Sequence, residues 1–168
     1  MKKTILFVLT AFVVILATGC SGREIKTYNS ARELVDATKS EVNIISPEDF
    51  KNVMESGQKF YLIDCREPGE FEAECIKGAL NVPRGVLEDE ISVAAPNKRT
   101  PIYIYCKKGD RSILAASVLP YLKYGNVKVI DGGFLKWKEK FPGLVEEKPV
   151  RGNKKSKSPA APSGGCGG

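Results

Sequence analysis

The chain has 168 residues, with 26 lysines and arginines, 20 aspartates and glutamates, and no histidine. The length suits one domain of about 100 to 150 residues with appendages. The excess positive charge lies at the ends, because residues 20–147 hold 19 basic and 20 acidic residues, whereas residues 148–168 hold five basic residues and no acid. A nucleic-acid-binding domain needs a basic face on its folded part, so nucleic acid is excluded as an expected partner.

Residues 1–19 have the pattern of a secretory signal peptide. Lys2 and Lys3 precede an apolar run over residues 5–17, which is shorter than the roughly 20 residues that span a bilayer. Cys20 ends the segment ATGC, which resembles a bacterial lipobox and predicts lipidation of Cys20. Cleavage after Gly19 by ordinary signal peptidase is the alternative. Both routes predict a cell-envelope protein on the periplasmic or extracytoplasmic face, and the lipid would anchor it to the membrane.

The remaining chain predicts one α/β domain between two appendages. Residues 20–40 are polar and are expected to form a linker, and residues 148–168, basic and rich in Gly, Pro and Ser, a disordered tail. The domain is expected over residues 41–147. It starts with a short strand and a helix that has Ser46 as N-cap, Pro47 in the first helical position and Gly57 as stop signal.

Strand-like segments then alternate with helix-like segments along the chain. We expect strands within 59–66, 79–83, 100–106 and 126–133, and helices within 67–78, 86–95, 111–125 and 134–143, the third ending or kinking near Pro120. This alternation predicts a three-layer α/β fold, with a parallel sheet of about five strands and helices on both faces.

The cysteines stand at positions 20, 65, 75, 106 and 166, with no Cys-x-x-Cys pair. With no histidine to complete a ligand set, a structural zinc site is not expected, and neither is a dithiol redox centre. No metal or other cofactor is predicted. Cys65 and Cys75 could form a disulfide in an oxidising compartment.

Cys106 is the predicted nucleophile. It ends the buried strand within 100–106, and ligands of parallel sheets bind beyond the carboxyl ends of the strands. The loop that follows is expected to bind a small anion and to stabilise a thiolate, through inward-turned amides, the N-terminus of the next helix and basic side chains. An inert buried thiol is the plain alternative. The predicted loop residues are Lys107, Lys108, Gly109, Asp110 and Arg111.

Three segments of the domain resemble the rhodanese-like single-domain sulfurtransferases over residues 41–143, and they are LIDCREPGEFEAECIKGALNVP, PIYIYCKKGDRSILAA and VIDGGFLKWKEKFPG. The family's active loop is a cysteine, four residues and an arginine, which Cys106 to Arg111 reproduce. Cys75 stands where the family usually has histidine. The other matched motif positions are Asp64, Arg66, Glu70, Phe71, Gly78, Ala79, Asn81 and Pro83.

The resemblance implies a rhodanese-like fold and a sulfurtransferase activity. Cys106 would take a sulfane sulfur from a small anion such as thiosulfate, or from a persulfide donor, and pass it to a thiol or cyanide. Asp64 and Arg66 are expected to form a supporting ion pair. Cys166, in SGGCGG, is either a candidate acceptor thiol for Cys106 or an idle residue in the tail.

Two other functions stay open at this point. A Cys-based phosphatase would resemble this fold, but its loop is one residue longer than the six residues from Cys106 to Arg111. A non-catalytic rhodanese-like binding or redox-sensing module is the other, and such modules commonly lack the cysteine that this chain has.

Overall fold

The computed structural model describes residues 25–147 of the chain. The predicted signal peptide, the lipidation site Cys20 and the tail with Cys166 lie outside the described residues, so those expectations stay predictions. None of the helices within residues 25–147 has the length and apolar character needed to cross a bilayer.

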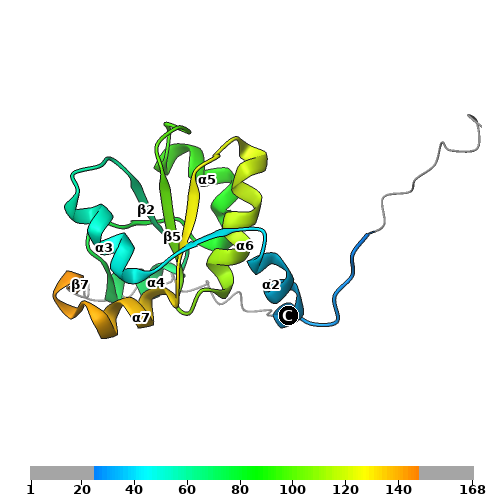
Figure 1. Ribbon diagram of the computed structural model, residues 1–168, viewed down its shortest axis with the longest axis horizontal. Coiled ribbons are helices and arrows are strands. Elements are labelled where there is room, and N and C mark those ends of the chain that lie inside the picture. Colours follow the sequence, from blue (N-terminus) through cyan, green and yellow to red (C-terminus); the bar gives the residue numbers. More distant parts are fainter. Residues whose placement is uncertain (1–24, 148–168) are drawn as a thin grey trace, which may run out of the picture. The chain divides into compact units, whose positions relative to one another are not determined.

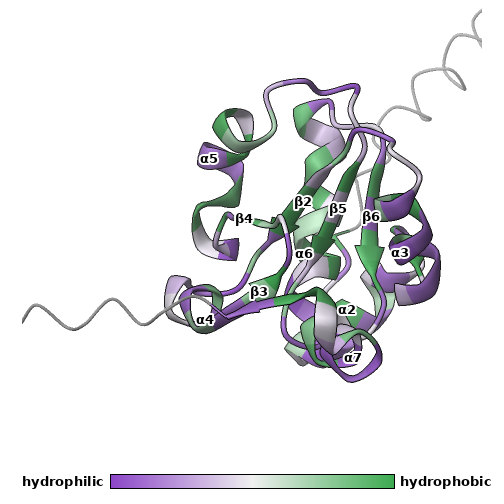
Figure 2. Ribbon diagram, turned by 90° about the vertical axis from the view of Figure 1, so that its left-hand side faces the viewer, coloured by the Kyte–Doolittle hydropathy of each residue, from purple (hydrophilic) through white to green (hydrophobic). Residues whose placement is uncertain are grey.

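The core of the domain is a five-stranded sheet in which every strand pairs in parallel with its neighbours, in the order β1-β6-β5-β2-β4. This confirms the predicted α/β fold with a parallel sheet of five strands. Figure 2 shows the central strands β2, β5 and β6 mostly in the colour of hydrophobic residues, whereas the helices around them mix hydrophobic and hydrophilic residues. The bounds of the five strands are Asn43–Ile45 (β1), Tyr61–Asp64 (β2), Leu80–Asn81 (β4), Ile102–Tyr105 (β5) and Val127–Ile130 (β6).

Helices cover both faces of this sheet (Figure 1). Consecutive strand residues point to opposite faces, so that Leu62 packs in one buried cluster and Ile63 in the other. Ile63 faces α5 (Leu87–Ala94) and α6 (Asp110–Val118), whereas Leu62 faces α3 (Pro47–Glu55) and α7 (Gly133–Lys140).

The local signals in the sequence act as expected at two helices. Ser46 caps α3 by accepting a hydrogen bond from the Asp49 amide, with Pro47 in the first turn. α6 ends at Val118, and the chain continues as a 3-10 turn over Leu119–Leu122 that contains Pro120. Proline cannot donate the next helical hydrogen bond, so the predicted break occurs there.

The segment predicted to be a linker over residues 20–40, with at most a short helical pattern, contains a helix in its second half. Residues Ala31–Lys39 form helix α2, and Val35 of this helix is buried in the same cluster as Ile63. The segment is polar in composition, and Val35 and Thr38 are the residues of this helix that are buried.

A second, smaller sheet was not expected. β3 (Glu74–Ile76) pairs antiparallel with β7 (Val145–Glu147), next to the short helix α4 (Pro68–Ala73). Each strand has three residues, which is too short for an alternating pattern to stand out. The segment 67–78, in which a helix was expected, therefore contains the helix α4 followed by the strand β3.

Candidate active site around Cys106

Cys106 lies directly after β5, at the carboxyl edge of the sheet, and its side chain is buried. The Gly109 amide donates a hydrogen bond to its sulfur at 3.2 Å. The Ser112 hydroxyl lies 3.7 Å from the same sulfur and 2.8 Å from the Gly109 carbonyl oxygen. The loop therefore wraps around the thiol and directs donors at it.

Gly109 gives the loop its turn. Its φ is +120°, a region that side-chain-bearing residues rarely adopt, and it is the N-cap of α6. The chain thus reverses within three residues and begins a helix whose N-terminal end lies next to the thiol. The positive end of the helix dipole favours a negative charge at this place.

Several groups stabilise the ionised form of Cys106. A hydrogen bond from the Cys65 thiol is the largest contribution, and together with those from Ser112 and Gly109 it outweighs burial and lowers the pKa of Cys106 to about 5. An ordinary cysteine titrates near 8.5. Cys106 is therefore a thiolate at neutral pH, in a chain that has no histidine to deprotonate it.

A cavity of about 200 Å³ opens over the thiol. Four of the five predicted loop residues line it together with Cys106, and they are Lys107, Lys108, Asp110 and Arg111. Lys107, Lys108 and Asp110 are exposed, and Gly109 is buried behind them. The structure thus brings all the predicted loop residues to one place, with a net positive charge around a space for a small anion.

Arg111 is held at the cavity by a residue from another element. Glu70 of α4 accepts two hydrogen bonds from the same Arg111 nitrogen, at 3.0 and 3.3 Å. Partial burial raises the pKa of Glu70, but the pair with Arg111 holds it below its usual value. Sequence reasoning matched Glu70 to a family motif without assigning it this role.

Asp64 and Arg66 form the expected ion pair beside the site. Both are buried, with the Arg66 guanidinium 2.6 Å from one Asp64 oxygen. The guanidinium also donates to the Glu74 carbonyl oxygen at 2.6 Å and lies 4.1 Å from the centre of the Phe134 ring. Arg66 does not line the cavity, and its Nε and Nη2 atoms bond to protein groups, so this pair supports the edge of the sheet.

The N-terminus of α7 holds the start of the active loop. The Phe134 amide donates to the Cys106 carbonyl oxygen at 2.8 Å, and the Leu135 amide to the Lys107 carbonyl oxygen at 3.1 Å. Gly133 makes this approach possible, because a Cβ there would lie 2.4 Å from the Cys106 carbonyl oxygen. The signal that could have revealed this contact is the glycine pair after β6, at 132 and 133.

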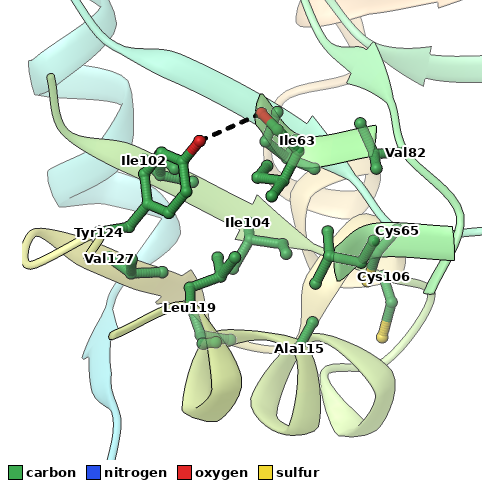
Figure 3. Packing of buried hydrophobic residues seen from close by; sticks show 14 of the residues in the cluster. Ile63, Cys65, Val82, Ile102, Ile104, Cys106, Ala115, Leu119, Tyr124 and Val127 are labelled. Atoms are coloured by element: carbon green, nitrogen blue, oxygen red, sulfur yellow. Dashed lines mark hydrogen bonds between the residues drawn. The ribbon is translucent and has the colours of Figure 1, made fainter. Parts of the chain in front are cut away.

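The possible disulfide between Cys65 and Cys75 is not present in the structure. Cys65, Cys75 and Cys106 are buried thiols. Cys65 lies beside Cys106 instead (Figure 3), whereas Cys75 lies in β3, opposite Glu146 of β7. Sequence reasoning missed the thiol pair, because it depends on which strands are neighbours. Among the described residues, no group of three Cys, Asp or Glu side chains is placed to bind a metal ion.

Comparison with known proteins gives a consistent family. The family model for the rhodanese-like domain matches residues 46–140. The chain is 31% identical over 103 residues to a probable adenylyltransferase/sulfurtransferase, MoeZ, of Mycobacterium tuberculosis, which covers 60% of this chain and 26% of that protein. The chain therefore spans about a quarter of the length of that relative.

Two further comparisons are with a relative of which the match covers two thirds and with a solved structure. The thiosulfate sulfurtransferase PspE of Escherichia coli is 31% identical over 70 residues, covering 42% of this chain and 67% of that protein. A crystal structure of thiosulfate sulfurtransferase from Pseudomonas aeruginosa superposes with a TM-score of 0.60 at 23% identity, covering 70% of this chain and 22% of that one. The structural likeness is a likeness of fold.

Proposed function

Because this chain belongs to the rhodanese-like domain family, we propose that it is a sulfurtransferase that carries a sulfane sulfur on Cys106 and takes it from thiosulfate or a related anion. The observation that carries this proposal is the Cys106 thiol, with a depressed pKa, at the floor of a cationic cavity of about 200 Å³. A reactive thiolate and an anion-binding space coincide there.

The first half of the reaction loads the enzyme. The Cys106 thiolate attacks the outer sulfur of thiosulfate, the S–S bond of thiosulfate breaks, and sulfite leaves with the electron pair. Lys107, Lys108 and Arg111 attract the dianion and stabilise the departing sulfite. Cys106 then holds a persulfide, and the loop, whose Gly109 amide donates to the Cys106 sulfur, stabilises the negative outer sulfur.

The second half passes the sulfur on. An acceptor thiolate or cyanide attacks the outer sulfur of the persulfide, and the Cys106 thiolate leaves with the electron pair. The groups that lower the pKa of Cys106 make it a good leaving group, since a stabilised thiolate leaves faster. Neither half needs a general base on the enzyme, which suits a chain without histidine.

The acceptor and the location are further parts of the proposal. Cys166 of the same chain is one candidate acceptor. Unchanged turnover in the Cys166→Ser variant would exclude this role for Cys166. Lipidation of Cys20 would anchor the enzyme to a membrane of the cell envelope. Cell fractionation of Cys20→Ser tests this, because only the lipoprotein route loses a membrane-bound form in that variant.

Turnover with thiosulfate and cyanide tests the activity, with thiocyanate as the measured product. The wild-type protein should form thiocyanate, and Cys106→Ser should form none. Cys75→Ser is the matched control, because it removes another buried thiol outside the loop. Release of phosphate from an aryl phosphate, without thiocyanate, would replace the proposal by a phosphatase, and absence of both products would favour a binding module.

A further inference from the structure

Cys65 is the second thiol at the carboxyl edge of the sheet. β2 and β5 are neighbours with Asp64 opposite Tyr105, and the Cys65 amide donates to the Tyr105 carbonyl oxygen at 2.9 Å. The residue after each of these two strand ends is a cysteine. Parallel strands lie about 4.8 Å apart, so Cys65 and Cys106 are lateral neighbours.

Both thiols point to the same face of the sheet. Cys65 follows Ile63 in the two-residue alternation of β2, and Cys106 follows Ile104 in that of β5, and all four pack in one buried cluster. Figure 3 shows the two cysteines side by side at the end of these strands, near Ala115 of α6. The exposed fraction is 0% for Cys65 and 1% for Cys106. In this apolar surrounding each of the two thiols is the largest influence on the pKa of the other.

The surroundings decide which sulfur keeps its hydrogen. Cys106 accepts the Gly109 amide and lies at the N-terminus of α6. Those groups favour the charged form of Cys106. For Cys65, the hydrogen bond to Cys106, burial and the nearby Asp64 carboxylate all raise the pKa of the thiol. Cys65 therefore keeps its proton at a pH where Cys106 is ionised.

We propose that Cys65 is a positioning residue, whose S–H group donates to the Cys106 thiolate and holds it ionised beneath the cavity. Cys65 is fully buried and does not line the cavity. In this role the Cys65 S–H group adds a second hydrogen-bond donor to that of the Gly109 amide. The chain has no histidine that could stabilise the thiolate instead. The inference uses the proposed function only in taking Cys106 as the reacting group.

The test compares two replacements of Cys65 by the pH dependence of alkylation. Iodoacetamide, a neutral reagent, is reacted with the full chain, and the Cys106 peptide is followed by mass spectrometry. Cys65→Ala removes the donor, whereas Cys65→Ser keeps a hydroxyl donor of similar size. In the Ala variant the midpoint should rise by about one pH unit, which slows alkylation about tenfold below both midpoints. The Ser variant should lie closer to the wild type.

Controls separate a lost donor from a disturbed core. Cys65→Val fills the site without a donor and should shift the midpoint as Cys65→Ala does, and thermal unfolding is measured for each variant. Cys75→Ala should leave the midpoint of Cys106 unchanged. An unchanged midpoint in the Ala and Val variants, or an equal rise in the Ser and Ala variants, would overturn the inference. Since alkylation needs no sulfur donor, this result is independent of whether the protein transfers sulfur.

Discussion

The strands β2 and β5 end side by side, and each is followed by an arginine that the fold uses in a different way. After β2, the Nε and Nη2 atoms of Arg66 donate to the buried Asp64 carboxylate, and Nη2 donates also to the Glu74 carbonyl oxygen. After β5, Arg111 has a side chain that is 35% exposed and borders a cavity. One strand end is closed and the other is open to a ligand.

The difference separates a structural charge from a functional one. A buried ion pair that does not line the cavity contributes to the fold rather than to ligand binding, and it becomes costly when one partner is removed. Charges around an open cavity contribute little to stability, but they keep their capacity to bind an anion. The two strand ends should therefore respond to substitution in opposite ways.

The largest expected effect on stability is at the closed strand end. Asp64→Asn leaves the buried Arg66 guanidinium without its counter-charge, and breaking a buried pair in this way costs about 3 to 5 kcal/mol. Denaturant unfolding measures the loss. Asp131→Asn, which breaks a surface pair with Lys136, is the control and should cost no more than about 1 kcal/mol. Equal losses in the two variants would contradict the distinction.

The next effect is at the contact between α7 and the active loop. Gly133→Ala places a Cβ against the Cys106 carbonyl oxygen at a residue with a φ of +60°, and such strain costs about 1 to 3 kcal/mol. Alkylation of Cys106 should slow as well, because the loop must move. Gly143→Ala, where a Cβ meets nothing within 4 Å, should change neither quantity. Normal reactivity of Cys106 in the Gly133 variant would show that the loop does not depend on this contact.

A smaller effect on stability, with a clear effect on reactivity, is expected at the open strand end. Arg111→Ala should slow loading with thiosulfate about tenfold to a hundredfold, because a hydrogen bond to a charged group is worth about 1.5 to 3 kcal/mol. The free energy of unfolding should change by less than about 1 kcal/mol. Stopped-flow release of sulfite measures loading, and Arg84→Ala, which breaks an ion pair on the surface with Glu88, is the control. An Arg111→Ala variant that is strongly destabilised but loads sulfur at the normal rate would contradict this prediction.

The smallest expected effect is that of pH between 6 and 8. With the pKa of Cys106 at about 5, the thiolate is protonated only as the pH falls through that value. Alkylation of Cys106 should therefore change by less than about twofold from pH 6 to pH 8, whereas a thiol of ordinary pKa near 8.5 would react many times faster at pH 8. A small model thiol in the same solution provides the comparison. A steep rise at Cys106 would mean that its surroundings do not stabilise the thiolate.

The parts of the molecule that sequence reasoning predicted are those encoded by neighbouring residues. Ser46 and Pro47 announce α3 because an N-cap and its helix are adjacent in the chain. The loop from Cys106 to Arg111 is also contiguous, so the thiol, the glycine and the cations could be assigned to one place before the fold was known. The alternation of apolar strands and helices was sufficient for the parallel sheet.

The parts that escaped depend on residues far apart in the chain. Cys65 meets Cys106 because β2 and β5 are adjacent, and the alternation of elements does not fix the order of strands. The pair of Glu70 and Arg111 spans 41 residues, and the pairing of β3 with β7 joins Glu74 to Glu147. In each case both residues can be read from the sequence, but their contact depends on the fold and could not be predicted.

The most direct test of the central claim is to locate the sulfur after a single loading step. The protein is treated with thiosulfate, the excess is removed, and each cysteine peptide is analysed by mass spectrometry under non-reducing conditions. The account predicts one added sulfur atom on the Cys106 peptide, which cyanide removes, and no added sulfur on the Cys65 or Cys75 peptides. An unmodified Cys106, or sulfur that persists on the chain in Cys106→Ser, would contradict it.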